Sequence, residues 1–153
     1  MSDRLTNAVE PEANLGCLFR LGYQRFRAAL DDALEELGLS AQDYVILSVF
    51  ETRAELSTSE LARITQVTRQ TMHTAVVGLE SAGLLERRAR NPRVVLVGLT
   101  RRGRKALKAA TDRVRAVERS ALTGLSRDDE RAVRNWLASL TTITTSTRQT
   151  MAK

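Results

Sequence analysis

The strongest periodic pattern in the chain lies between residues 57 and 85. Apolar residues recur there at i, i+3, i+4 and i+7, from Met72 to Leu79, which is the spacing of a buried helical stripe. A Ser-x-x-Glu capping box formed by Ser57 and Glu60 precedes an earlier helix, and Thr68 is a capping residue before the later one. The pattern predicts two helices joined by a short turn, a helix-turn-helix.

The polar face of the second helix carries side chains that can read the edges of DNA bases. Arginine can bridge the acceptors of guanine, glutamine can bridge adenine, and threonine offers both a hydroxyl and a methyl group. This face is only singly charged, unlike an ordinary solvated Lys/Glu face. We therefore predict DNA contacts from the start of the first helix and from this face of the second: Ser57, Thr68, Arg69, Gln70, Thr71, His73 and Thr74.

The pattern changes from helical to strand-like after Leu85. The run LLERRARNPRVVLVGLT contains two β-favouring segments around Asn91-Pro92, a turn dipeptide, and predicts a hairpin beside the helix-turn-helix. A basic hairpin of this kind, called a wing, can reach the DNA backbone or the minor groove, where an arginine senses the negative potential. The wing residues predicted to do so are Arg87, Arg88, Arg90, Asn91 and Arg93.

Long amphipathic patterns flank this central part on both sides. An apolar stripe covers residues 13–37, Gly38 ends that helix, and Ser40 begins the next, after which Glu55-Leu56 can supply a minimal strand. Beyond the wing, two further amphipathic helices are expected to begin at a capping threonine and a capping serine, Thr100 and Ser126.

The apolar stripes of the first helix and the last two exceed what a winged helix needs for its own core. Long stripes with no third layer to cover them usually pack against a second copy, which predicts a homodimer. The fold class is therefore mainly α: a winged helix-turn-helix with a small β-hairpin wing and terminal dimerisation helices. The predicted boundaries are a flexible tail over 1–12, dimerisation helices over 13–38 and 101–146, the winged helix-turn-helix over 40–100 and a C-terminal tail over 147–153.

Positive charge is concentrated on the same part of the chain. The 153 residues carry a net charge of +6, but residues 67–108 hold ten Lys and Arg against two acids, whereas residues 1–66 hold six Arg against eleven acids. A basic segment that coincides with the polar helix is the footprint expected for contact with phosphates. The alternative is an arginine-rich composition that serves no partner.

Other classes of protein lack support in the sequence. A single cysteine excludes an internal disulfide, the apolar runs are too short to span a membrane, and the N-terminus lacks the apolar region of a signal peptide, so we expect a cytoplasmic protein. No nucleophile-base pair, phosphate-binding glycine loop or cluster of metal ligands accompanies the only histidine, His73. We therefore expect neither an enzyme nor a cofactor nor a metal.

Three segments carry a family resemblance: LSAQDYVILSVF, LSTSELARITQVTRQTMHTAVVGLESAGLLERR and LVGLTRRGRKAL. Over about residues 13–145, the chain resembles the MarR (multiple-antibiotic-resistance regulator) family of bacterial winged-helix regulators. The resemblance implies a homodimer that binds a palindromic operator in double-stranded DNA, usually as a repressor, and releases it when a small aromatic or anionic effector binds. It assigns residues 68–74 to the recognition helix and Arg93 to the wing. The chain departs from the family pattern twice: Asn91-Pro92-Arg93 replaces an Asp-x-Arg pair in a shorter hairpin, and Gly78 replaces a basic residue.

The resemblance places the effector pocket between the dimerisation helices and the winged domain. An aromatic carboxylate could be held there by Arg20, Tyr23 and Arg27 on the first helix and Tyr44 on the second. The equally supported alternative is that these residues are ordinary surface arginines and interface tyrosines. Cys17 has apolar neighbours and is interpreted as a small core residue, with a thiol-based redox sensor as the alternative. For the whole chain, the alternative is a winged helix that only binds other proteins.

Overall fold

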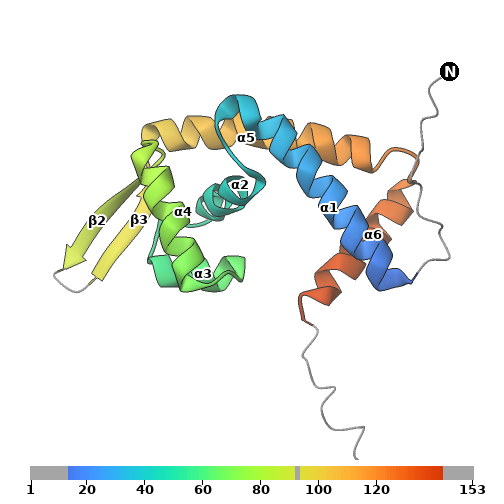
Figure 1. Cartoon of the computed structure of the whole chain (residues 1–153), viewed down its shortest axis with the longest axis horizontal. Helices are drawn as coiled ribbons and strands as arrows, with labels where there is room; N and C mark the ends of the chain where they lie inside the picture. The colour runs from blue at the N-terminus through green and yellow to red at the C-terminus, as the bar shows by residue number, and fades with distance from the viewer. Residues whose placement is uncertain (1–13, 92–93, 143–153) are drawn as a thin grey trace, which may run out of the picture. The chain divides into compact units, whose positions relative to one another are not determined.

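The computed structural model describes residues 14–91 and 94–142, and the chain divides into two units, residues 1–117 and 118–153. Helix α5 (Arg101–Ala121) begins in the first unit and ends in the second, which also contains α6 (Arg127–Leu140). The other elements, all in the first unit and shown in Figure 1, are α1 (Leu15–Leu34), the 3-10 turn η1 (Glu35–Leu37), α2 (Ala41–Ser48), the 3-10 turn η2 (Val49–Glu51), β1 (Glu55–Leu56), α3 (Thr58–Thr65), α4 (Arg69–Ser81), β2 (Leu85–Asn91) and β3 (Val94–Leu99).

Short-range hydrogen bonds explain where the helices begin. Helices α2, α3 and α6 each start with a capping box at the predicted serine, and Gly38 takes the left-handed conformation (φ 65°) after η1. Hydrogen bonds from the backbone and hydroxyl of Ser57 hold the pKa of Glu60 below its ordinary value. The cap therefore contributes its full stabilisation of α3 when the pH is above the ordinary pKa of glutamate. That stabilisation is lost as the pH falls through the lowered pKa of Glu60.

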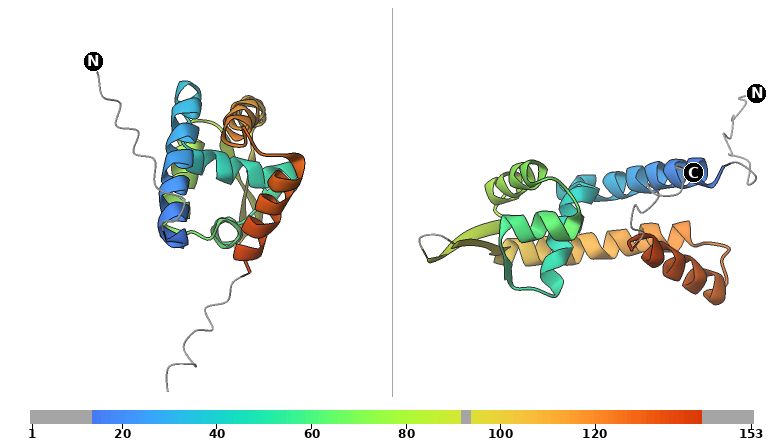
Figure 2. Two further views of the ribbon diagram at one scale, coloured as in Figure 1. Left: turned by 90° about the vertical axis from the view of Figure 1, so that its right-hand side faces the viewer. Right: turned by 90° about the horizontal axis from the view of Figure 1, so that it is seen from below.

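The wing belongs to a three-stranded antiparallel sheet with the order β1-β3-β2. Leu56 of β1 lies opposite Val97, and Leu85 of β2 lies opposite Leu99, so the minimal strand and the hairpin predicted from the sequence are both confirmed. The hairpin extends as a two-stranded ribbon beyond helices α2, α3 and α4, as Figure 1 and the right view of Figure 2 show.

The core of the first unit lies between α4, the sheet and the neighbouring helices. On α4 the predicted stripe is confirmed, because Met72 and Val76 are completely buried and Leu79 is nearly so. Burying one such side chain contributes roughly 1.5–3 kcal/mol, and this burial leaves the opposite face of α4 to solvent. The largest fully buried side chains are Leu34, Ile46, Leu47, Leu61, Met72, Val76 and Val97.

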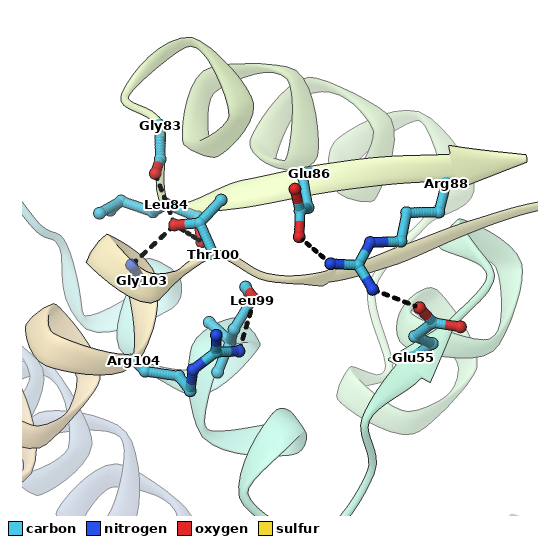
Figure 3. Close-up of polar contacts among 9 residues, drawn as sticks. All are labelled: Glu55, Gly83, Leu84, Glu86, Arg88, Leu99, Thr100, Gly103 and Arg104. Atoms are coloured by element: carbon cyan, nitrogen blue, oxygen red, sulfur yellow. Dashed lines mark hydrogen bonds and ion pairs between the residues drawn. The ribbon is translucent and has the colours of Figure 1, made fainter.

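The start of α5 is tied to the turn that follows α4 (Figure 3). Thr100 Oγ1 donates to the carbonyl oxygen of Gly83 at 2.7 Å and accepts from the N–H of Gly103 at 2.9 Å, and Thr100 N–H donates to Leu84 O at 3.1 Å. The prediction that Thr100 begins this helix is therefore confirmed. Gly103 lies against the same turn, because a Cβ at this position would come within 2.0 Å of Leu84 O.

Two features of α1 differ from the sequence prediction. The α-helix ends at Leu34 and a 3-10 turn completes the predicted length, and Cys17 is exposed rather than part of the core. The interpretation of Cys17 as a core residue is wrong because only the C-terminal half of α1, around Leu30 and Leu34, packs against the core. Exposure leaves the thiol accessible, so redox sensing stays a prediction. The predicted tails, Arg93 and residues 143–146 at the end of the predicted dimerisation helices lie outside the described residues.

Large apolar side chains are exposed on each unit. In the first unit, Leu15, Phe19 and Tyr23 of α1 are 46–64% exposed, and in the second, α6 contains no buried residue. On α6 the exposed apolar residues are Val133, Trp136 and Leu137. Within the described part of the chain, none of the helices combines the length and the apolar character that crossing a bilayer requires.

Candidate nucleic-acid interface

The geometry of the helix-turn-helix follows from two caps and one left-handed residue. Gln66 has φ 56° and ends α3, and Thr68 Oγ1 accepts from Thr71 N–H at 3.1 Å to begin α4. Before α3, Ser57 Oγ accepts from Glu60 N–H at 3.2 Å and donates to its carboxylate at 2.7 Å. The hydroxyls of Ser57 and Thr68 therefore hold the helix ends in place, a structural role beside the DNA contacts predicted for them.

The structure brings the other predicted contacts of α4 onto one exposed surface. Arg69, Gln70, Thr71, His73 and Thr74 are all exposed: Gln70, His73 and Thr74 face away from the buried stripe, and Arg69 and Thr71 lie at its borders in the first turn of the helix. None of these side chains shares in the core, although the hydroxyl of Thr71 bonds to that of Thr68 at 2.8 Å and the hydroxyl of Thr74 donates to Gln70 O at 3.2 Å. Their role in DNA contact stays a prediction.

One cation near this face was missed by the sequence analysis. Arg63 of α3 and Arg69 of α4 line a surface hollow of about 430 Å³, together with Ser59 and Glu60. Arg63 lies in the acidic part of the chain, so the charge distribution along the sequence did not single it out. A helical projection would have found it, because Arg63 follows Ser59 by four residues and Glu60 by three and so falls with them on the exposed face of α3.

The wing arginines have distinct environments. Arg87 Nε donates to Glu80 Oε2 at 2.8 Å, while the guanidinium of Arg88 binds both Glu86 and Glu55 (Figure 3). Glu86, and to a smaller extent Glu55, raise the pKa of the Arg88 guanidinium. Exposed ion pairs of this kind are weak, so a DNA phosphate could replace the carboxylates.

Arg90 is presented differently because it lies at an irregularity of β2. Ala89 pairs with Val95 and Asn91 with Val94, so Arg90 has no pairing residue on β3, as in a β-bulge. Bulges bend a strand and change the direction of a side chain. Arg90 is exposed and has no hydrogen-bond or ion-pair partner among residues 14–91 and 94–142, which makes it the most available wing cation there.

The residues predicted to bind an effector lie on two helices that contact each other. Arg20, Tyr23 and Arg27 are exposed on α1, and Tyr44 of α2 is partly buried against the core. Arg27 lies 3.8 Å from Asp31, whose other oxygen accepts from the first N–H of α2. These four residues line neither the hollow beside Arg69 nor a second hollow of about 420 Å³ at the base of the wing.

Metal binding finds no support in the part of the chain that the structure describes. No group of three His, Cys, Asp or Glu side chains there is arranged to hold an ion. His73 is exposed on the polar face of α4, where it can donate or accept a hydrogen bond.

Known proteins match both the sequence and the fold. A family model described as the MarR family matches residues 37–93. The HTH-type transcriptional repressor Rv2887 of Mycobacterium tuberculosis is 36% identical over 132 residues, which cover 84% of this chain and 94% of the repressor, and the repressor Mb2911 of Mycobacterium bovis matches equally well.

Solved structures of the M. tuberculosis protein agree with this match. Its complex with DNA aligns with a TM-score of 0.70 at 33% identity and covers 84% of this chain and 98% of that one. Its complex with salicylic acid aligns with a TM-score of 0.66 at 35% identity and covers 86% and 99%. The fold class predicted from the sequence is confirmed.

Proposed function

The chain belongs to the MarR family of winged helix-turn-helix transcriptional regulators, and we propose that it is a cytoplasmic homodimer that represses transcription from a palindromic operator and leaves it when an effector binds. The observation that carries the proposal is the exposed polar face of α4, positioned by the caps of Ser57 and Thr68. The family regulates transcription and does not catalyse reactions.

Charge supports the same proposal. The segment from residue 67 to residue 108 carries a net charge of +8, and it contains α4, the wing and the start of α5. Neutralising several phosphates releases counterions, so we expect affinity for any DNA to fall steeply with salt, while preference for one sequence depends on α4.

Selection of sequences from a random DNA pool at moderate salt tests this proposal. A homodimer should enrich a palindrome whose half-sites lie about one helical turn, ~34 Å, apart. A pool that yields no enriched sequence would instead favour the protein-interaction alternative. A single unpaired half-site would contradict the dimer but not the recognition helix.

Replacing Arg69 or Gln70 by alanine should separate base reading from backbone contact. Each substitution should cost about 1–3 kcal/mol of operator binding and relax the preference at particular base pairs, because a bidentate contact to a base edge is lost. Arg90→Ala is the matched wing variant: it should weaken all sequences alike and lower the slope of log K against log salt by about one phosphate contact. Unchanged sequence preference in Arg69→Ala and Gln70→Ala would rule out the recognition assignment.

We further propose that the effector is a small aromatic acid bound by Arg20, Tyr23, Arg27 and Tyr44. Support comes from the M. tuberculosis relative, which has been crystallised with salicylic acid and with p-aminosalicylic acid. On this chain, α1 supplies exposed cations, and α2, which contacts α1, supplies a partly buried phenol. An effector can release DNA only if it binds the free conformation more tightly than the DNA-bound one.

Salicylate is the probe for this site. It should lower operator affinity in the wild type, and Arg20→Ala should raise its dissociation constant about tenfold, because a hydrogen bond to a charged group contributes roughly 1.5–3 kcal/mol. Tyr44→Phe should weaken it less, and Arg25→Ala, an exposed arginine on another side of α1, is the control. Undiminished binding in both Arg20→Ala and Tyr44→Phe would remove this site and leave the DNA-binding proposal untouched.

A further inference from the structure

An apolar side chain lies in the middle of the polar face of α4. Val77 is 42% exposed and is neither part of the core cluster nor among the apolar residues that pack against it. It follows Gln70 by seven residues, His73 by four and Thr74 by three, which places all four on one side of the helix. A single exposed valine on a protein surface is ordinary. This one stands among the side chains proposed to read bases.

The hydroxyl of the neighbouring Thr74 turns back toward the helix, which leaves the methyl group of this threonine facing outward. Thr74 Oγ1 donates to the carbonyl oxygen of Gln70 at 3.2 Å, and Ser81 Oγ donates to that of Val77 at 2.9 Å. A threonine Cβ carries one hydroxyl and one methyl, so the methyl of Thr74 is what this residue presents beside Val77. Together the methyl groups of Thr74 and Val77 form an apolar surface, the methyl ridge, next to the amide of Gln70.

The major groove offers one apolar group to such a ridge, the 5-methyl of thymine. We propose that the methyl ridge packs against a thymine methyl and that Val77 is a specificity-determining residue of the operator complex. The inference rests on the proposed function, because it requires α4 to lie in the major groove. Seven residues of helix span about 10 Å. Since base pairs are ~3.4 Å apart, Val77 would extend the sequence read by Gln70 by up to about three base pairs.

Replacement of thymine by deoxyuridine tests the contact, because uracil lacks only the 5-methyl group. In a selected operator, we expect one thymine in each half-site to contact the methyl ridge. Replacing that thymine by deoxyuridine in one half-site should weaken operator binding about fourfold, and replacing it in both half-sites should weaken binding about 15-fold. In Val77→Ala the thymine operator should bind more weakly, and the same replacement should cost less than twofold.

Two further variants make the test specific. Val77→Thr keeps a methyl group at this position, so it should keep most of the loss of affinity that deoxyuridine causes. Val45→Ala truncates a similarly exposed valine on α2 and should keep that loss of affinity in full. Because Val77 is exposed, its variants should fold like the wild type, which circular dichroism checks. The proposal is overturned if no thymine shows a penalty in the wild type, or if Val77→Ala retains the full penalty. In both cases the operator would still be bound, whereas failure of the proposed function would abolish sequence-selective binding altogether.

Discussion

Gly103→Ala should lower the free energy of unfolding by roughly 3 kcal/mol, at the upper end of the usual cost of overpacking. The added Cβ would lie 2.0 Å from Leu84 O, 2.9 Å from the Leu84 carbonyl carbon and 3.0 Å from Leu99 Cδ2. The first two atoms are backbone, and they cannot retreat while Thr100 remains bonded to Gly83 and Leu84. Either α5 moves away from the turn or those hydrogen bonds break.

Urea denaturation followed by circular dichroism measures the effect, and Gly78→Ala is its control. A Cβ at Gly78, inside α4, would have no atom within 4 Å, so alanine there should stabilise the protein by about 0.5–1 kcal/mol through helix propensity. The two glycines should thus respond with opposite signs. Equal stability of Gly103→Ala and the wild type would contradict the close contact between α5 and Leu84.

Leu137→Glu should dissociate the proposed dimer and weaken operator binding by on the order of 100-fold, because each monomer would then bind its half-site without the other. Helix α6 contains no buried residue, and Leu137 is 42% exposed. Val133 and Leu140 fall on the same side of the helix, four residues before and three after it. An ionised carboxylate in the middle of that apolar stripe would be desolvated at an interface, which is strongly unfavourable.

Asn135→Glu introduces the same charge on the other side of α6 and should leave both assembly and operator affinity unchanged. Sedimentation at micromolar concentration distinguishes a dimer from the 17.0 kDa monomer. A wild-type monomer would refute the dimer outright, and a dimeric Leu137→Glu variant would locate the interface elsewhere.

The elements that the sequence predicted well are those set by neighbouring residues. The serines that begin α2, α3 and α6 bind backbone groups only three residues away, so their capping could be inferred from type and spacing. The buried stripe of α4 was equally evident, since helical periodicity alone places Met72 and Val76 together.

The environment of individual side chains depended on contacts between distant parts of the chain. Arg88 binds Glu55, which is 33 residues away and reaches it only because β1 pairs with β3 in this register. Cys17 is exposed because of how far α1 extends past the core, which its apolar neighbours in the sequence do not reveal. For Val77, helical spacing alone gives its place on the polar face, whereas its exposure of 42% and the turned hydroxyl of Thr74 required the structure.

The hydroxyl of Thr100 couples the end of α4 to the start of α5. Because this one group bonds both to the Gly83 carbonyl oxygen after α4 and to the Gly103 N–H in α5, we expect a displacement of the first turn of α5 to move the turn after α4 with it. Such a displacement would reach the helix proposed to read DNA without passing through the wing.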